Sequence, residues 1–374
     1  MKKNADRIRG VAVIVLVFGA MAFISATEVG SEKPLLKIWD PFPTLELQGN
    51  PTPDELEYLG VAQKTRFSLK DIGAKIVLVE FFNKFCPHCQ QQAPILNQLY
   101  DKIQQDSLLQ AQVRMVGIGV GNNQRQIEMY KAEKSIPFPL FPDPNYQFHD
   151  DIGRPRTPFI VLFKKTSADE GHVAATYMGL VSESDTLLQA LRHLLSPGVS
   201  VLQAEAAWQA VDELSASSKL SDEEFMGLVK AYFKQLEARV SQLDRISKNG
   251  SDLLLKAQIK LKGQTRTFYV SKIYRPTVCD VCHDAHFWFV FDDQGTITHF
   301  APIHLTKAYN KEWREKDVQK VAQRIVNHRL TDTLAFDPEV DAVTSATMTT
   351  GLIYDTINRA TKLFAKLKED GIIK

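Results

Sequence analysis

The chain has 374 residues, which at roughly 150 residues per domain gives room for two or three domains, each with its own core. Lys and Arg total 45 and Asp and Glu total 44, so the formal net charge of +1 offers no electrostatic basis for nucleic acid as the main partner. Apolar residues (44%) and charged residues (24%) are balanced as in a globular protein, which excludes a disordered or polytopic membrane protein. Four cysteines exclude a dense disulfide scaffold, and they form two C-x-x-C pairs.

The N-terminal residues have the pattern of an export signal. Four basic residues lie between positions 2 and 9 and precede an uncharged apolar run over residues 11–26, close to the lower limit for a bilayer span. Such a start is typical of a cleaved secretion signal or of a transmembrane signal anchor. We therefore expect residues 1–29 to be an anchor or a signal, and the rest of the chain to face the periplasm or another extracytoplasmic space.

Composition and periodicity divide the remaining chain into four segments. Residues 30–64 are rich in proline, lack periodicity and are interpreted as a tether. Residues 65–196 alternate buried-strand runs with helical patterns, which predicts an α/β domain. Residues 197–250 are interpreted as a helical spacer that ends in a helix over residues 222–246. Residues 251–374 predict an α+β domain of strand hairpins followed by helices.

The first cysteine pair, Cys86 and Cys89, directly follows a strand-length apolar run over residues 75–82. A helix is expected to begin at Pro87, and the partial positive charge and free N–H groups of a helix N-terminus stabilise a thiolate. Cys86 is then the exposed nucleophile, and Cys89, one turn later, resolves the mixed disulfide. His88 adds a hydrogen-bond donor near the Cys86 thiolate. A structural disulfide across so short a loop would add little stability, so redox chemistry is the favoured interpretation.

The residues around this pair resemble the thioredoxin superfamily. The resemblance extends over about residues 65–195 and includes the segment FFNKFCPHCQ and a later Thr157-Pro158 before the strand FIVLF. It implies a cis bond before Pro158, which faces the dithiol and shapes the substrate groove. The tetrapeptide CPHC is similar to that of DsbA-type oxidants, whereas its surroundings resemble the TlpA/redoxin branch, many of whose members reduce substrates. Disulfide or dithiol proteins are the expected partners, and the direction of electron flow stays open.

A second motif, D-A-V-T-S-A-T from Asp341 to Thr347, precedes an expected helix near the C-terminus. It resembles the acceptor motif of FMN-binding domains in Rnf and sodium-pumping quinone reductase complexes, over about residues 250–370. The resemblance implies that a flavin transferase outside the cytoplasm joins FMN phosphate to Thr347. The site would include Asp341, Thr344, Ser345 and Ala346, with helix N–H groups receiving the phosphate charge. Ser345 stands where glycine is commoner. The alternative is a plain helix cap, for which Thr and Ser are favoured.

The second cysteine pair, Cys279 and Cys282, is followed by His283 and then by His286. C-x-x-C-H is the attachment pattern of a c-type haem, with His283 as an axial ligand. The surrounding strand-like segments offer little helical framework, which counts against haem. Three alternatives stay open, namely a redox disulfide that exchanges electrons with flavin or with the first pair, a metal site formed by these four residues, and a structural disulfide.

Two redox modules on one exported chain lead to two hypotheses. The first is a membrane-tethered extracytoplasmic thiol–disulfide oxidoreductase whose FMN-binding domain couples a respiratory electron donor to dithiol chemistry. The second is a c-type haem-binding electron-transfer protein, or a cytochrome-maturation factor that keeps C-x-x-C-H thiols reduced for haem attachment.

Overall fold

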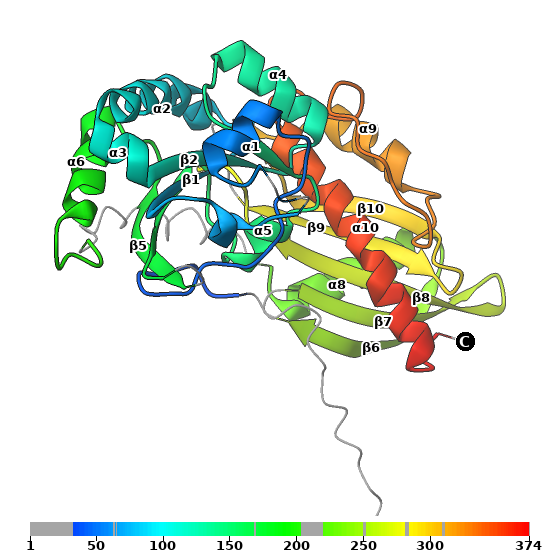
Figure 1. The fold of residues 1–374 in the computed structure, drawn as a ribbon. Coiled ribbons are helices and arrows are strands. Elements are labelled where there is room, and N and C mark those ends of the chain that lie inside the picture. Colours follow the sequence, from blue (N-terminus) through cyan, green and yellow to red (C-terminus); the bar gives the residue numbers. More distant parts are fainter. Residues whose placement is uncertain are drawn as a thin grey trace, which may run out of the picture.

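The structure of the protein is a computed structural model, which describes residues 33–373 apart from 63, 65, 168–169, 203–219, 250–251, 281–283 and 309–310. The expected signal or anchor over residues 1–29 lies outside the described residues. In the described part of the chain, no helix combines the length and hydrophobicity needed to cross a bilayer. Two domains with separate five-stranded sheets lie side by side (Figure 1).

The first domain is an α/β unit with the strand order β3-β2-β1-β4-β5. Its central strand β1 (Ile76–Phe82) is buried along its whole length, which explains why its sequence is a continuous apolar run rather than an alternating one. It pairs in parallel with β2 (Val113–Val120) and antiparallel with β4 (Phe159–Lys165). The other elements are η1 (Leu69–Asp71), α2 (Pro87–Gln105), α3 (Ser107–Gln112), α4 (Gln124–Lys134), β3 (Leu140–Asp143), α5 (Gln147–Asp151), β5 (Gly171–Met178) and α6 (Ser184–Leu195).

Residues 33–62 belong to this first domain, so the prediction of a tether over residues 30–64 is wrong for them. The backbone N–H of Leu36 donates to Ile152 O over 3.0 Å, and a short helix, α1 (Pro53–Leu59), follows. Buried apolar side chains from this segment join the domain core, namely Leu36, Phe42, Leu47, Leu59 and Val61. These buried side chains are unevenly spaced along a segment that is mostly neither helix nor strand. Its apolar residues therefore show no periodic pattern in the sequence.

The second domain is an antiparallel sheet with the order β10-β9-β8-β7-β6, and it agrees with the expected α+β class. Alternate residues of β9 (Ala285–Asp292) enter two different cores. Phe289 packs in the core of α9 (Glu315–Ile325) and α10 (Thr347–Glu369), and Trp288 packs in the core of α8 (Asp222–Gln235). The sheet therefore has helices on both faces. The other strands are β6 (Arg239–Asn249), β7 (Asp252–Leu261), β8 (Gln264–Arg275), β10 (Ile297–His304), β11 (Thr306–Lys307) and β12 (Lys311–Glu312).

The helix expected over residues 222–246 is wrong in its second half, because α8 ends at Gln235 and β6 is an edge strand of the second sheet. Val240 and Leu243 are three residues apart, which is a helical spacing. A β-bulge between Val240 and Gln242 inserts one extra residue, so both apolar side chains pack on the α8 side of the sheet. The second domain therefore begins near residue 220 rather than 251. The remainder of the expected spacer falls largely on residues 203–219, outside the described residues.

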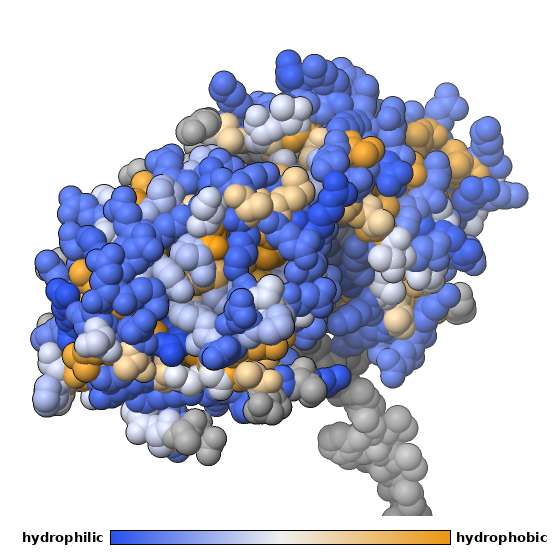
Figure 2. Space-filling model, turned by 45° about the horizontal axis from the view of Figure 1, so that its top comes forward, coloured by the Kyte–Doolittle hydropathy of each residue, from blue (hydrophilic) through white to orange (hydrophobic). Residues whose placement is uncertain are grey.

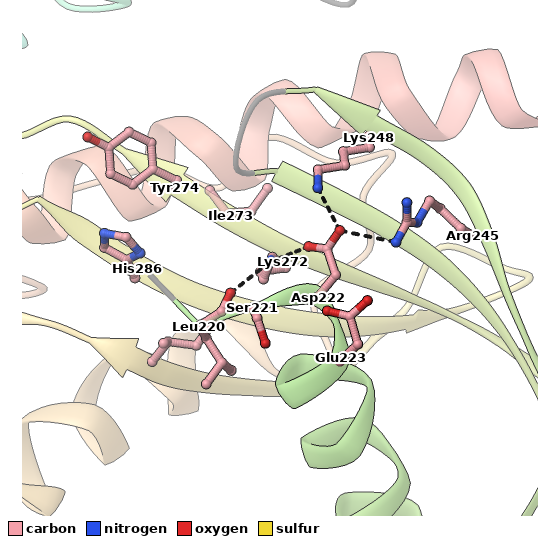
Figure 3. A pocket seen from close by; sticks show the side chains of 11 residues that line it. Leu220, Ser221, Asp222, Glu223, Arg245, Lys248, Lys272, Ile273, Tyr274 and His286 are labelled. Carbon is pink, nitrogen blue, oxygen red and sulfur yellow. Dashed lines mark hydrogen bonds and ion pairs between the residues drawn. The ribbon is translucent and has the colours of Figure 1, made fainter. Parts of the chain in front are cut away.

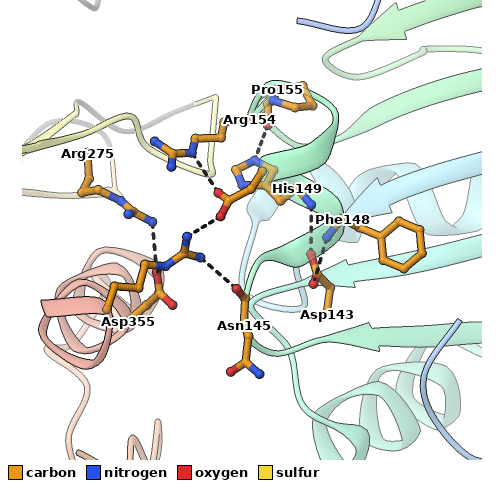
Figure 4. A network of polar contacts seen from close by, with 10 residues as sticks. Asp143, Asn145, Phe148, His149, Arg154, Pro155, Arg275 and Asp355 are labelled. Atoms are coloured by element: carbon orange, nitrogen blue, oxygen red, sulfur yellow. Dashed lines mark hydrogen bonds and ion pairs between the residues drawn. The ribbon is translucent and has the colours of Figure 1, made fainter. Parts of the chain in front are cut away.

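An ion-pair network joins α5 of the first domain to α10 of the second (Figure 4). Arg359 pairs with Asp150 and donates to the backbone oxygen of Asn145 over 2.8 Å. On its own helix it pairs with Asp355 at 2.7 Å, and Arg275 of β8 pairs with the same carboxylate at 3.0 Å. These ion pairs hold the two domains together in addition to the packing between them.

The face of the molecule seen in Figure 2 is mainly hydrophilic, with small and separate hydrophobic patches.

A buried carboxylate, Asp284, forms a second interdomain contact. Its Oδ1 pairs with Arg156 Nη2 of the first domain at 3.1 Å and accepts from the Thr277 N–H at 2.9 Å, and its Oδ2 accepts from the Tyr274 hydroxyl at 2.6 Å. The Arg156 and Asp284 side chains are 8% and 3% exposed, so solvent does not screen the pair.

We predict that Asp284→Ala lowers the free energy of unfolding by about 3 kcal/mol, because it breaks a buried ion pair and removes the acceptor of the Thr277 N–H. Denaturant titration of the full chain measures the change. The matched control is Glu339→Ala, which removes an exposed interdomain pair with Arg125 at 3.7 Å and should cost less than about 1 kcal/mol. Equal effects of the two substitutions would contradict the prediction.

Candidate active site

The first cysteine pair begins helix α2. Cys86 is the N-cap residue, Pro87 is the first helical residue, and the Cys86 sulfur accepts from the Cys89 N–H at 3.4 Å. Both side chains are completely buried. The sequence predicts that Cys86 is exposed, and this prediction is wrong in the described structure, because the second domain covers the sulfur.

The loop opposite the dithiol contains a cis peptide bond between Thr157 and Pro158, as the thioredoxin resemblance implies. Thr157 is fully buried, and its carbonyl oxygen lies 3.5 Å from the Cys86 sulfur. The loop therefore faces the first cysteine of the pair and forms one wall of the site.

Residues 277–280 of the second domain, called here the interface segment, lie against this loop. The N–H of Thr157 donates to Val278 O at 2.7 Å, and the Thr157 hydroxyl donates to the same oxygen at 3.0 Å. Thr157 and Cys279 form a parallel β-bridge. The interface segment thus adds to the cis-proline loop as an extended peptide adds to a strand edge.

This pairing brings the two cysteine motifs together. The Cys279 sulfur lies 3.8 Å from the Cys86 sulfur, although the two residues are 193 positions apart in the sequence. Cys279 is completely buried. The neighbouring Asp280 has one carboxylate oxygen 4.0 Å from the Cys279 sulfur and the other 2.7 Å from His88 Nδ1. His88 therefore contacts the Asp280 carboxylate of the second domain.

The electrostatics of the site distinguish the two sulfurs of the first pair. The Cys86 sulfur accepts hydrogen bonds from the Cys279 thiol, which has the larger effect, and from the Cys89 thiol. Together they lower the pKa of Cys86 far below its ordinary value, although burial acts in the opposite direction. Burial raises the pKa of Cys89 well above its ordinary value, and the negative charge at Cys86 raises it further. Cys86 is thus the thiolate and Cys89 the thiol, and the main donor to Cys86 comes from the second domain.

The AhpC/TSA family model matches residues 38–178, which contain the dithiol and the cis-proline loop. The N-terminal half of the chain is a thioredoxin-like domain of the AhpC/TSA family. This AhpC/TSA domain is similar to the thiol-disulfide oxidoreductase ResA of Geobacillus thermodenitrificans, with 21% identity over 185 residues, covering 50% of this chain and 94% of that protein. The family match does not extend into the second domain.

The chain is also similar to two solved structures. StoA from Bacillus subtilis is 18% identical, covers 34% of this chain and 89% of its own, and has a TM-score of 0.28. A secreted disulfide oxidoreductase of Mycobacterium tuberculosis is 17% identical, covers 35% of this chain and 90% of its own, and has a TM-score of 0.29.

The AhpC/TSA domain also contains a buried carboxyl group, Glu80, that the sequence analysis missed. Glu80 lies in β1, and its Oε1 has no hydrogen-bond partner among the described residues. Burial raises the pKa of Glu80 to about 8, and the negative charge at Cys86 adds to the rise. The sequence feature that could have identified Glu80 is a single acidic residue within the apolar run IVLVEFF. Glu80 is a neutral acid at pH 7 and interacts electrostatically with both cysteines.

The alternative of a metal site formed by Cys279, Cys282, His283 and His286 stays a prediction, because Cys282 and His283 lie outside the described residues. His286 lies on β9 and lines a separate cavity of about 450 Å³ beside the start of α8 (Figure 3). Asp222 in this cavity is ion-paired with Lys248 and Lys272. Ligand atoms of a different set, Cys86, Cys279 and Asp280, lie within 4.8 Å of one another and could hold a metal ion.

The segment that resembles a flavin-acceptor motif lies at the start of α10. Thr347 is its first residue and is partly exposed, and its hydroxyl has no hydrogen bond to any described residue. Ser345 has a φ of 62°, in the left-handed region where glycine is favoured, which explains why glycine is commoner there. Thr344 is exposed and Ala346 is buried.

The Asp341 carboxylate makes two contacts within the second domain. Its Oδ2 accepts from the Asp337 N–H at 2.9 Å, and its Oδ1 pairs with Arg324 at 3.0 Å. The carboxylate is buried, so Asp341 fixes the turn that precedes the motif.

We predict that the reduced protein loses stability as the pH rises from about 5 to 8. The pKa of Glu80 is about 8 in the folded protein against an ordinary value of 4.5, so the stabilisation is complete below pH 4.5 and is lost as the pH rises through 8. The slope contributed by Glu80 reaches at most about 1.4 kcal/mol per pH unit. Glu80→Gln removes this contribution, and denaturant titrations at several pH values measure it. Glu128→Gln, on the exposed side of α4, is the control and keeps the slope. A slope that Glu80→Gln leaves unchanged would assign the titration to another group.

Proposed function

We propose that the chain is a thiol–disulfide oxidoreductase of the ResA and DsbE type that works outside the cytoplasm, at the membrane. The observation that carries the proposal is the contrast between the two sulfurs of one C-x-x-C pair, with the pKa lowered at Cys86 and raised at Cys89. A thiolate opposite a cis-proline loop, with a thiol one helical turn behind it, is suited to two-step disulfide exchange. The basic and apolar N-terminal pattern supports the extracytoplasmic location.

The exchange follows from the positions of these groups. The Cys86 thiolate attacks a substrate disulfide, a Cys86–substrate disulfide forms, and one substrate sulfur leaves as a thiolate. Because Cys86 then carries no charge, one cause of the raised Glu80 pKa disappears. Glu80 can then give its own proton to the departing substrate thiolate and, as a carboxylate, accept the Cys89 proton. Cys89 next attacks the Cys86 sulfur, which releases the second substrate thiol. The pair is oxidised by two electrons and the substrate is reduced, and the same steps run in reverse for an oxidising protein.

We also propose that the second domain carries FMN on Thr347 and that the bound flavin supplies one- and two-electron chemistry. Three features of the described residues fit the group. Thr347 is partly exposed, Ser345 has the left-handed backbone that glycine would adopt, and the first N–H groups of α10 have no acceptor within the helix. These residues would hold the phosphate. A respiratory donor and a flavin transferase are the corresponding partners.

The rival hypothesis, a c-type haem, has less support from the described positions. Cys279 is fully buried, and its sulfur contacts the Cys86 sulfur. A haem thioether at Cys279 would need the space that Cys86 and the cis-proline loop occupy. A haem stain on a denaturing gel of the protein from its native host distinguishes the two cofactors.

In a chain in which Cys279 is also replaced by Ser, we predict that Cys89→Ser accumulates mixed disulfides on Cys86, because both neighbouring sulfurs that could release the substrate are gone. Cys86→Ser should trap at most about a tenth as much, since the Cys89 thiol is buried and its pKa is raised. Incubation with glutathione disulfide followed by mass spectrometry of the peptides measures both. Equal trapping by the two variants would contradict the assigned roles.

We predict that Thr347→Ala, co-expressed with a flavin transferase, carries no covalent flavin, because the acceptor hydroxyl is missing. In-gel flavin fluorescence and intact mass report the result. Thr331→Ala, which changes an exposed threonine outside the motif, is the control and keeps the flavin. An unmodified parent protein under the same conditions would end the flavin proposal and leave the dithiol chemistry intact.

A further inference from the structure

The Cys86 and Cys279 sulfurs are already in contact at 3.8 Å. A disulfide bond measures about 2.05 Å, so an approach of less than about 2 Å would join them. Both sulfurs are fully buried, and the Cys279 thiol is the first cause of the lowered Cys86 pKa. Few external substrates could reach a sulfur so enclosed without displacing the interface segment.

Hydrogen bonds hold the interface segment in this position. Val278 O accepts two of them from Thr157, so Cys279 lies next to the cis-proline loop with its backbone extended. Asp284 closes the other side of the same loop through its ion pair with Arg156 and its bond to the Thr277 N–H. The two sulfurs are therefore kept together by fixed contacts, and such positioning raises the rate of a reaction between them.

Asp280 is placed to handle a proton. One carboxylate oxygen lies 4.0 Å from the Cys279 sulfur, and the other is 2.7 Å from His88 Nδ1. The Asp280 side chain is only 14% exposed, so its carboxylate lies beside the Cys279 sulfur with little access for water. Among the described residues, the charged or titratable groups that face it are His88 on α2 and the two sulfurs of Cys86 and Cys279.

We infer that Cys279 is a built-in redox partner of Cys86, and that the two domains exchange electrons through a Cys86–Cys279 disulfide with Asp280 as proton acceptor. This inference rests on the proposed thiol–disulfide activity. In the step, the Cys279 proton passes to Asp280 and the Cys279 sulfur attacks Cys86 of the oxidised pair. The Cys86–Cys279 bond forms, the Cys86–Cys89 bond breaks, and Cys89 leaves as a thiolate that takes its proton from Glu80. The Cys279 sulfur is thereby oxidised and the Cys89 sulfur reduced, and the transfer of two electrons is complete when a second thiol attacks Cys279 and releases Cys86 as a thiolate.

The test uses the full chain with Cys89→Ser and Cys282→Ser, so that Cys86 and Cys279 are the remaining cysteines. Treatment with diamide, a small thiol oxidant, should give an intramolecular cross-link, seen as the loss of two hydrogens in the intact mass and as one peptide pair joined through Cys86 and Cys279. The matched variant with Cys86→Ser and Cys282→Ser keeps Cys89 and Cys279 and should cross-link at least about tenfold more slowly, because its sulfurs lack this positioning.

The outcomes separate the inference from the proposed function. Trapping of glutathione on Cys86 in the chain with Cys89→Ser and Cys279→Ser, together with no Cys86–Cys279 cross-link in the test variant, overturns the inference alone. Failure of both experiments overturns the proposed function as well. A metal ion that co-purifies with the chain and is lost on Cys279→Ser would assign Cys86, Cys279 and Asp280 to a metal site and would also overturn the inference.

A separate experiment tests whether Asp280 accepts the Cys279 proton. In the two-cysteine variant, Asp280→Asn should slow the cross-link at least about tenfold at pH 7, because Cys279 must then lose its proton to solvent. At pH 9 the two rates should converge, since hydroxide removes the proton in either case. Asp280→Glu should restore part of the rate at pH 7. An equal slowing at both pH values would indicate a structural role and would overturn the assignment of Asp280 as proton acceptor.

Discussion

The paired hydrogen bonds from Thr157 to Val278 O are the interaction on which the site depends. They join the cis-proline loop of one domain to the interface segment of the other, and they bring Cys279 against Cys86. Without them Cys86 would have one wall of its site open to solvent and would lose the donor that contributes most to its low pKa. Burial of the nucleophile and its acidity therefore have the same origin, the contact between the two domains.

The dithiol has a carboxyl group on each side. Glu80 lies within the first domain and interacts with Cys86 and Cys89, whereas Asp280 belongs to the second domain and lies beside Cys279. Burial is the main cause of the raised pKa in both. Each attacking thiol must lose a proton, and each leaving thiolate must gain one. Two weakly acidic groups within one buried site meet these needs better than water could, because little water reaches the sulfurs.

The start of α10 connects this site with the flavin-acceptor motif. Met348 and Leu352 of α10 belong to the hydrophobic core of the first domain, together with Val278 and Cys279 of the second. Thr347 precedes Met348 directly, so the residue that we propose as the flavin acceptor lies where α10 meets the interface. Further along the same helix, Arg359 pairs with Asp150 of the first domain. One helix therefore carries the motif and helps to fix the relative position of the two domains.

The sequence by itself determined the local features. The position of Cys86 before a helix start, the proline at residue 158 and the apolar run of β1 are encoded by neighbouring residues, and the structure contains all of them. Only the tertiary structure decided that Cys86 is buried, that Cys279 meets it across 193 positions, and that Glu80 has a raised pKa. These properties depend on distance and on the exclusion of water, which arise when segments far apart in the sequence pack together, and no local pattern records them.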